Sequence, residues 1–264
     1  MNGRVLIVAG SDSSGGAGIQ ADIKTVTMLG GYAATAITAL TAQSTLGISA
    51  IVPVAPAFVR QQMEAVLGDI GADCIKTGML HDRGVVAAVA DCLEAAAPGV
   101  PLVVDPVMLA TSGARLLDAD AIELLKQRLI ARARVMTPNL PEAEALLGRP
   151  IAGADEMMAA AQALRQLGAA AVVLKGGHLA GSRLRDVVVD GETSFVLESF
   201  RVETRHTHGT GCTLASAIAT GIAQGMALRA AVERAHDFVQ QAIRSAPGFG
   251  RGQGPIDHAH PRRV

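Results

Sequence analysis

Short apolar runs alternate with longer stretches rich in alanine and leucine along almost the whole chain, and this alternation constrains the fold most. Runs such as residues 5–9 and 171–174 have strand length and are apolar throughout, as expected of strands covered on both faces. The longer stretches between them have helical length. The pattern predicts an α/β fold with a mostly parallel central sheet and helices on both of its faces.

The pattern also predicts where the elements lie. Strands are expected at 5–9, 33–40, 48–54, 73–77, 102–105, 135–136 and 171–174, with a hairpin over 186–197. Helices are expected from the end of a loop at 10–18 to about 29, and at 57–67, 83–97, 118–131, 141–147, 155–167, 211–224 and 228–246. With no linker or repeat in sight, one domain over 1–264 is expected, with a loosely held tail from about 248.

Composition excludes several classes of protein. A net charge of −1 and the absence of Trp argue against binding to nucleic acid, and the charge also argues against an anionic membrane surface. The first apolar run is too short for a signal sequence or a membrane span. Cys74, Cys92 and Cys212 are far apart, which gives no support for disulfides or a zinc site. The chain is expected to be soluble and cytoplasmic.

The segment His208-Gly209-Thr210-Gly211-Cys212-Thr213 has the composition of an anion-binding turn. Two glycines around a threonine let the backbone approach a ligand and turn several N–H groups the same way. The helix expected to follow adds unpaired N–H donors and the positive end of its dipole. This turn predicts a phosphate-handling enzyme with Cys212 at the edge of its anion site.

Polar and glycine-rich segments follow the expected strands repeatedly. They are residues 11–18, Gln43-Ser44, Thr77-Gly78-Met79, Asp105-Pro106, residues 139–142 and Lys175-Gly176-Gly177. In an open α/β sheet, ligands bind beyond the carboxyl ends of the strands. The repeated placement therefore predicts a ligand site at this edge of the sheet.

The glycine-rich loop at 10–18 is ambiguous when taken alone. It lacks the lysine of a GxxxxGK[ST] phosphate loop and the spacing of GxGxxG. It could therefore be a tight connection or a ligand loop. Asp22, in the helix after it, could face a pocket or solvent, and solvent is the simpler interpretation.

Four other polar residues each have a structural and a functional interpretation. Asp105 could cap a loop or bind Mg²⁺, directly or through water. Asn139 and Glu142 could cap a helix, or position Mg²⁺ and phosphate. Lys175 could form a salt bridge or reach the transferred phosphate as a point charge.

Cys212 has three interpretations. It could be an inert buried residue, as Cys74 and Cys92 are expected to be. It could be a nucleophile paired with His206 or His208. At a helix N-terminus its thiol pKa should fall, which would make a thiolate or a proton acceptor.

Together these motifs identify a family resemblance. The segments that carry it are Ala9-Gly10-Ser11-Asp12-Ser13-Ser14-Gly15-Gly16-Ala17-Gly18-Ile19-Gln20-Ala21-Asp22, Thr38-Ala39-Leu40-Thr41-Ala42-Gln43, Lys76-Thr77-Gly78-Met79-Leu80, Asp105-Pro106-Val107-Met108, Thr137-Pro138-Asn139-Leu140-Pro141-Glu142-Ala143, Lys175-Gly176-Gly177-His178 and His208-Gly209-Thr210-Gly211-Cys212-Thr213. In this order they resemble the ribokinase-like superfamily. They are most similar to the bacterial hydroxymethylpyrimidine/phosphomethylpyrimidine kinases of thiamine biosynthesis.

The resemblance implies a three-layer α/β/α ribokinase-like fold and a homodimer. It also implies ATP-dependent phosphorylation of 4-amino-5-hydroxymethyl-2-methylpyrimidine and then of its monophosphate. By position, Gln43 would bind the pyrimidine in a pocket lined by Gly10, Asp22, Met79 and Val107. Asp105 and Glu142 would organise Mg²⁺, Asn139 would lie beside the phosphates, and Lys175 would neutralise them. Gly209, Thr210, Gly211 and Cys212 would form the anion hole.

Three other functions remain as alternatives. A pyridoxal or pyridoxine kinase is the nearest, although Gln43 and Met79 favour the pyrimidine. A non-catalytic pyrimidine sensor would not need Asp105, Lys175 and the anion turn together. A cysteine hydrolase built on Cys212 and His208 would lack an orienting third group.

Overall fold

The computed structural model describes residues 1–109 and 116–263. Within them, nine strands form one sheet in the order β3-β2-β1-β4-β5-β6-β7-β8-β9. The strands are β1 (Arg4–Asp12), β2 (Tyr32–Ser44), β3 (Gly47–Pro53), β4 (Cys74–Thr77), β5 (Leu102–Val104), β6 (Val135–Met136), β7 (Val172–Leu174), β8 (Arg183–Val189) and β9 (Ser194–Phe200). From β2 to β7 all neighbours pair in parallel, while β3, β8 and β9 join by antiparallel pairing.

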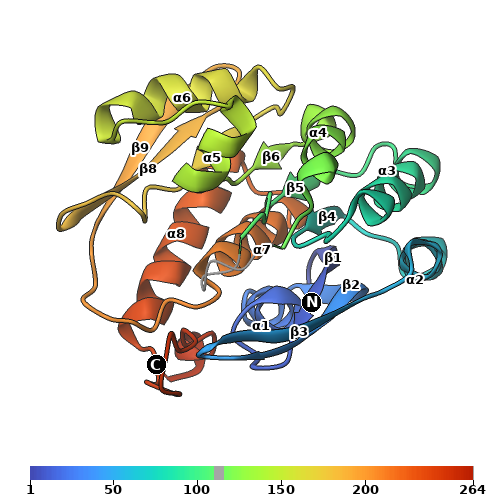
Figure 1. The fold of residues 1–264 in the computed structure, drawn as a ribbon, viewed down its shortest axis with the longest axis horizontal. Coiled ribbons are helices and arrows are strands. Elements are labelled where there is room, and N and C mark those ends of the chain that lie inside the picture. The colour runs from blue at the N-terminus through green and yellow to red at the C-terminus, as the bar shows by residue number, and fades with distance from the viewer. Residues whose placement is uncertain (110–115, 264) are drawn as a thin grey trace.

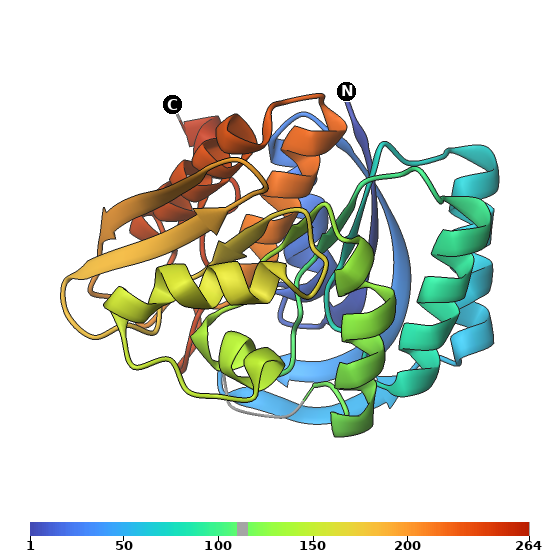
Figure 2. The same cartoon turned by 90° about the horizontal axis from the view of Figure 1, so that it is seen from above.

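Helices cover both faces of this sheet (Figures 1 and 2). The helices are α1 (Gly18–Met28), α2 (Pro56–Asp69), α3 (Arg83–Ala96), α4 (Ala119–Arg128), α5 (Leu140–Leu147), α6 (Met157–Arg165), α7 (Thr210–Ala223) and α8 (Leu228–Arg244). Helices α1, α7 and α8 pack together on one face, and α2 to α6 lie on the other. The expected three-layer α/β/α architecture is confirmed.

The largest difference from the predicted elements is at the first glycine-rich loop. Strand β1 does not end at Ala9 but continues to Asp12 after a local shift of register, so that Asp12 pairs with Thr41 of β2. The long strand β2 supplies this partner and itself continues to Ser44. Asp12 and Gln43 are therefore held by the sheet at positions where a loop was expected.

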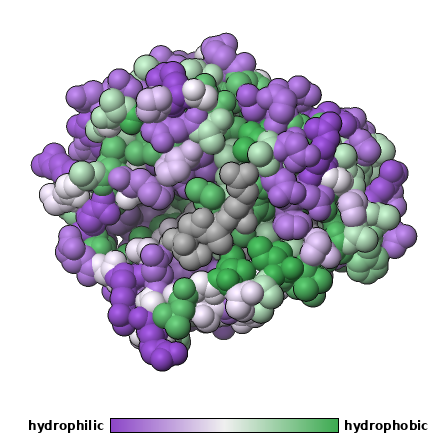
Figure 3. Space-filling model, in the orientation of Figure 1, coloured by the Kyte–Doolittle hydropathy of each residue, from purple (hydrophilic) through white to green (hydrophobic). Residues whose placement is uncertain are grey.

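The edge formed by β2 and β3 leaves apolar side chains exposed. Leu40 and Val52 oppose each other across the antiparallel pair, and Leu46 lies in the turn between the strands. All three side chains are about half exposed or more. Figure 3 shows apolar surface gathered in this lower part of the view, where Figure 1 places β2 and β3.

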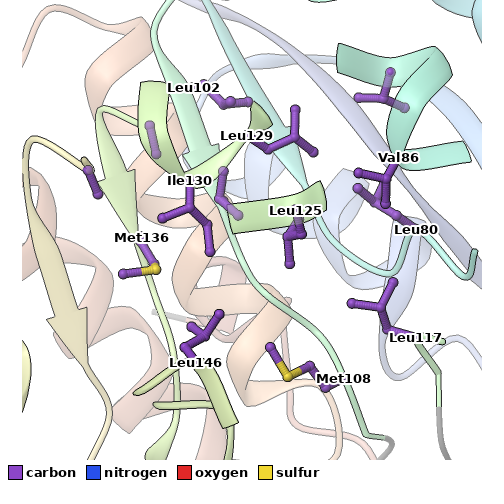
Figure 4. Packing of buried hydrophobic residues seen from close by; sticks show 14 of the residues in the cluster. Leu80, Val86, Leu102, Met108, Leu117, Leu125, Leu129, Ile130, Met136 and Leu146 are labelled. Atoms are coloured by element: carbon purple, nitrogen blue, oxygen red, sulfur yellow. The ribbon is translucent and has the colours of Figure 1, made fainter. Parts of the chain in front are cut away.

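Each face of the sheet has its own hydrophobic core. Along β1, Leu6 and Val8 point into the core beneath α2 to α6, whereas Val5 and Ile7 point into the core beneath α1, α7 and α8. Figure 4 shows part of the first core, including Leu125 from α4. Coverage on both sides is the reason why the strands read as continuous apolar runs.

The structure corrects the prediction of a loosely held tail from residue 248. The backbone N–H of Gly252 donates to Thr45 Oγ1 at 3.2 Å, and that of Asp257 donates to the Ala242 carbonyl at 2.9 Å. His258 is buried, with Nε2 at 2.9 Å from Thr213 Oγ1 near the start of α7. These partners are distant in sequence, so local composition did not reveal them; Val264 lies outside the described residues.

None of the helices in the described ranges is long and apolar enough to cross a membrane.

His258 makes the stability of the fold depend on pH. Burial lowers its pKa from 6.5 to about 4, so the folded chain holds the imidazole uncharged. The free energy of unfolding should therefore fall as the pH drops from 6.5 towards 4, by up to about 3 kcal/mol from this group. In His258→Gln this part of the pH dependence should disappear. Urea denaturation of both proteins at pH 7 and pH 4.5 measures it, and an equal loss in both would contradict the assignment.

Candidate active site

A cavity of about 970 Å³ lies at the carboxyl edge of the parallel strands. It is lined by residues that end or follow successive strands of the sheet: Gln43 from β2, Gly10 from β1, Met79 after β4, Asp105 and Val107 after β5, Asn139 and Glu142 after β6, and Lys175 after β7. Residues 209–212, at the start of α7, also line it. Because neighbouring parallel strands end at one edge, residues far apart in sequence meet in one cavity.

The anion turn has the geometry that its sequence predicts. Gly209 has a left-handed backbone, with φ of +89°, and immediately precedes α7. A Cβ atom at Gly209 would overlap the carbonyl oxygen of Gly16. No side chain caps the start of α7, and Thr210, Gly211 and Cys212 face the cavity. The turn therefore presents a helix N-terminus to the cavity, and only glycine fits at position 209.

Lys175 lies beside this turn between two carboxylates. Its Nζ donates to Asp105 Oδ1 at 3.0 Å and lies 4.0 Å from Glu142 Oε2. A Cβ atom at Gly211 would be 3.2 Å from the same Nζ. Although burial alone would lower the pKa of Lys175, the charges of Asp105 and Glu142 raise it, so the lysine remains cationic.

Asn139 and Glu142 cap a helix and also face the cavity. Asn139 Oδ1 accepts from the backbone N–H of Glu142 at 2.9 Å, and Glu142 Oε2 accepts from that of Asn139 at 2.8 Å. This reciprocal pair is a capping box at the start of α5. Burial raises the pKa of the Glu142 carboxyl. The prediction that Asn139 and Glu142 cap a helix is therefore confirmed. The capping contacts hold both side chains at the cavity wall.

Cys212 lies in the cavity wall as a neutral thiol. Burial raises its pKa to about 12, against the lowering effect of Lys76. The prediction that the helix N-terminus would lower this pKa is therefore wrong, because loss of water around the thiolate outweighs the nearby positive charge. His208 Nε2 donates to Asp12 Oδ2 at 2.8 Å, and within the described part of the chain no hydrogen bond joins His208 to Cys212.

Asp22 lies neither in the cavity wall nor at the surface. Its side chain is fully buried behind the wall, where both oxygens accept from Lys76 Nζ at 2.9 Å. Ser216 Oγ on α7 donates to the same carboxylate at 2.6 Å. Both predictions for Asp22, solvent exposure and a place in the pyrimidine pocket, are therefore wrong.

A group of contacts joins the first loop, β2 and the anion turn. Asp12 accepts hydrogen bonds from His208, from Ser14 and from the backbone N–H of Ala17. Burial pushes the pKa of Asp12 up, but these hydrogen bonds outweigh it and lower the pKa to about 2. Gln43 Nε2 lies 3.3 Å from the same ring nitrogen of His208. Gln43 and the turn after His208 are thus held against each other.

The chain matches a known protein family over nearly its whole length. A family model described as phosphomethylpyrimidine kinase matches residues 12–257. This chain belongs to that family. It is a phosphotransferase by this membership.

Individual relatives of this kinase agree with the family assignment. It is 48% identical to the hydroxymethylpyrimidine/phosphomethylpyrimidine kinase of Rhizobium meliloti, with 98% of each chain covered. It is 51% identical to the thiamine biosynthesis bifunctional protein ThiED of Geobacter sulfurreducens, over 97% of this chain but 52% of that protein. The kinase thus spans about half the length of the bifunctional relative.

Solved structures confirm the ribokinase-like fold of this kinase. An ADP complex of Bacillus subtilis pyridoxal kinase superimposes with a TM-score of 0.92 at 34% identity, covering 100% of both chains. Phosphomethylpyrimidine kinase from Clostridium difficile superimposes with a TM-score of 0.80 at 39% identity, covering 91% of this chain and 99% of that one.

Sequence reasoning missed two groups of residues in this kinase. It gave no role to Asp12 or Lys76, although a lysine inside an apolar strand signals a buried charge. It also missed the far end of the cavity, where Asp186 of β8 and His236 and Gln240 of α8 contribute to the lining. Spacing of four along a helix places the last two on one face, which is a weak signal by itself.

Gly209→Ala tests the contact between the turn and the first loop. The added Cβ would meet the Gly16 carbonyl, so we expect the kinase activity to fall by about a hundredfold or more through loss of the oriented donors. Gly225→Ala is the matched control, because Gly225 has a similar φ of +78° and no heavy atom within 4 Å of a Cβ. Steady-state kinetics of both variants measure the effect. Equal activity in the two would show that the contact is unimportant.

Proposed function

We propose that this kinase transfers the γ-phosphoryl group of ATP to 4-amino-5-hydroxymethyl-2-methylpyrimidine and then phosphorylates the resulting monophosphate. The observation that carries the proposal is the convergence of Gln43, Lys175 and the anion turn on one cavity. The names of the Rhizobium meliloti and Clostridium difficile relatives support the pyrimidine substrate. Two solved relatives, the pyridoxal kinases of Bacillus subtilis and Staphylococcus aureus, were studied with ADP or an ATP analogue, which supports the nucleotide.

Gln43 would recognise the pyrimidine. Its amide carries one donor group and one acceptor group, which match a ring nitrogen and the adjacent amino group. Gly10 and Met79 would form one wall of the pyrimidine pocket. A Cβ atom at Gly10 would lie 2.9 Å from Met79 Sδ, so only glycine leaves room for the thioether there. Val107 lines the same cavity. Asp22 has no part in this pocket.

Asp105 and Glu142 fit the requirements of a magnesium site. Mg²⁺ favours one or two carboxylates, with water and substrate phosphate as its other ligands. These carboxylates flank Lys175 beside the anion turn. The described residues contain no cluster of three or more His, Cys, Asp or Glu side chains that could hold a metal ion by themselves, so water and phosphate would supply the other ligands. When bound, the cation would neutralise phosphate charge. Asn139 would lie beside the phosphates.

The anion turn would stabilise the transferred group. The backbone N–H groups at Gly209, Thr210, Gly211 and Cys212 would donate to its oxygens, and Lys175 would neutralise them as a point charge. The N–H of Thr210, which donates to the Thr207 carbonyl at 3.3 Å in this structure, would be shared with the phosphate or turned towards it. Phosphoryl transfer through a loose transition state depends mainly on positioning and electrostatics. A strong base is therefore not essential, which agrees with a neutral Cys212 thiol.

A mass-spectrometric time course tests the proposed reaction. Purified protein is incubated with Mg-ATP and the hydroxymethylpyrimidine, with pyridoxal in a parallel tube and EDTA in a third. We expect the monophosphate and then the diphosphate, with no product in the EDTA tube. Phosphorylation of pyridoxal alone would identify a pyridoxal kinase instead, and silence with both substrates would favour the non-catalytic sensor.

Cys212→Asp should separate the two phosphorylation steps. In the second step the attacking phosphate oxygen is already anionic, so a carboxylate at position 212 would repel it, whereas a neutral thiol does not. We expect the second kcat/KM to fall at least about tenfold more than the first. Cys212→Ser, which keeps a neutral side chain, is the control. Equal losses in both steps of the Asp variant, measured separately, would contradict the charge argument.

We also propose a homodimer in the cytoplasm. The exposed apolar residues Leu40, Leu46 and Val52 on the β2–β3 edge offer a surface that a second copy could cover. The cytoplasm supplies the ATP that the reaction consumes.

A further inference from the structure

A fully buried lysine lies behind the wall of the active site. Lys76 comes from β4 and is 0% exposed, as is Asp22 opposite it. Its Nζ donates to both carboxylate oxygens of Asp22, each at 2.9 Å. A Cβ at Gly78, just after β4, would lie 3.0 Å from Nζ. Neither Lys76 nor Asp22 lines the cavity.

Stability alone is a weak reason for this ion pair. Removing two charges from water costs several kcal/mol for each ion, and well-packed apolar residues often stabilise a core at least as well. The same face of the sheet is otherwise filled by apolar side chains such as Ile7, Cys74 and Val103. A buried ion pair in this apolar core therefore suggests that Lys76 and Asp22 contribute to function as well as to stability.

The pair lies against the first turns of α7. Ser216, whose Oγ donates to Asp22 Oδ1 at 2.6 Å, is four residues after Cys212, so the two side chains share one face of the helix. Lys76 is the charge with the largest effect on the Cys212 thiol, larger than that of Asp22 or Asp105.

We propose that Lys76 is a positioning residue for phosphoryl transfer, whose buried ammonium holds positive charge behind the anion turn and Cys212. Asp22 and Ser216 fix the ammonium in place without entering the cavity. Lys175 supplies positive charge to the turn from the cavity side. On the core side the Lys76–Asp22 pair has no net charge, but the ammonium affects the Cys212 thiol more than the opposing carboxylate does. This role rests on the proposed kinase function.

The double variant Lys76→Met/Asp22→Leu tests the proposal, because it removes both charges and leaves neither buried ion unpaired. We expect kcat to fall about tenfold or more in both phosphorylation steps, while KM for the pyrimidine stays nearly unchanged, since neither residue lines the pocket. Thermal unfolding and circular dichroism establish that the variant is folded. If this variant does not fold, the variant Lys76→Met/Asp22→Asn is tested in its place, because the asparagine keeps a hydrogen-bond partner for Ser216.

A second readout does not depend on kinase activity. Cys74 and Cys92 are buried, so a small alkylating reagent reports mainly on Cys212, with Cys212→Ser as the background. The double variant loses both the ammonium and the opposing Asp22 carboxylate. Because Lys76 has the larger effect on the thiol, the thiolate fraction should fall and alkylation at pH 9 should be slower than in the wild type. A folded double variant with wild-type kcat and a wild-type alkylation rate would overturn the proposal. A wild type that phosphorylates neither substrate would instead refute the kinase function, and alkylation would still test the charge.

Discussion

The contact between the first glycine-rich loop and the anion turn is the constraint on which the site depends. Gly209 lies against the backbone of Gly16 so closely that no Cβ fits, and the Asp12–His208 hydrogen bond fastens the two segments beside that contact. The loop belongs to the substrate end of the cavity, and the turn begins α7. The distance between the proposed pyrimidine and phosphate sites is thus set by packed backbone rather than by mobile side chains.

Charge is arranged around this contact in two layers. On the cavity side, Lys175 lies between Asp105 and Glu142, at a place where phosphate and a divalent cation would add further charge. On the core side, Lys76 and Asp22 form a pair that water does not reach. Electrostatic effects are larger in such dry surroundings than in water. The neutral Cys212 thiol lies between the layers and adds no charge of its own.

Much of the site was predictable because its residues lie at the ends of apolar strands. Gln43, Met79, Asp105 and Lys175 were expected at one edge of the sheet, and they line one cavity. The mistakes concern burial. Asp22 was placed in solvent or in the pocket, and the Cys212 thiol was expected to have a lowered pKa, because the helix pattern does not show how much water a neighbouring strand excludes.

The sequence by itself determined the class of fold, the position of nearly every element and the anion turn, because these follow from local periodicity and from the backbone freedom of glycine. Only the tertiary structure decided the strand order, the packing of residues 252–258, and the pairing of Asp12 with His208 and of Asp22 with Lys76. Such pairs join residues 54 to 196 positions apart. Their energies depend on burial and distance, which exist only once the chain has folded.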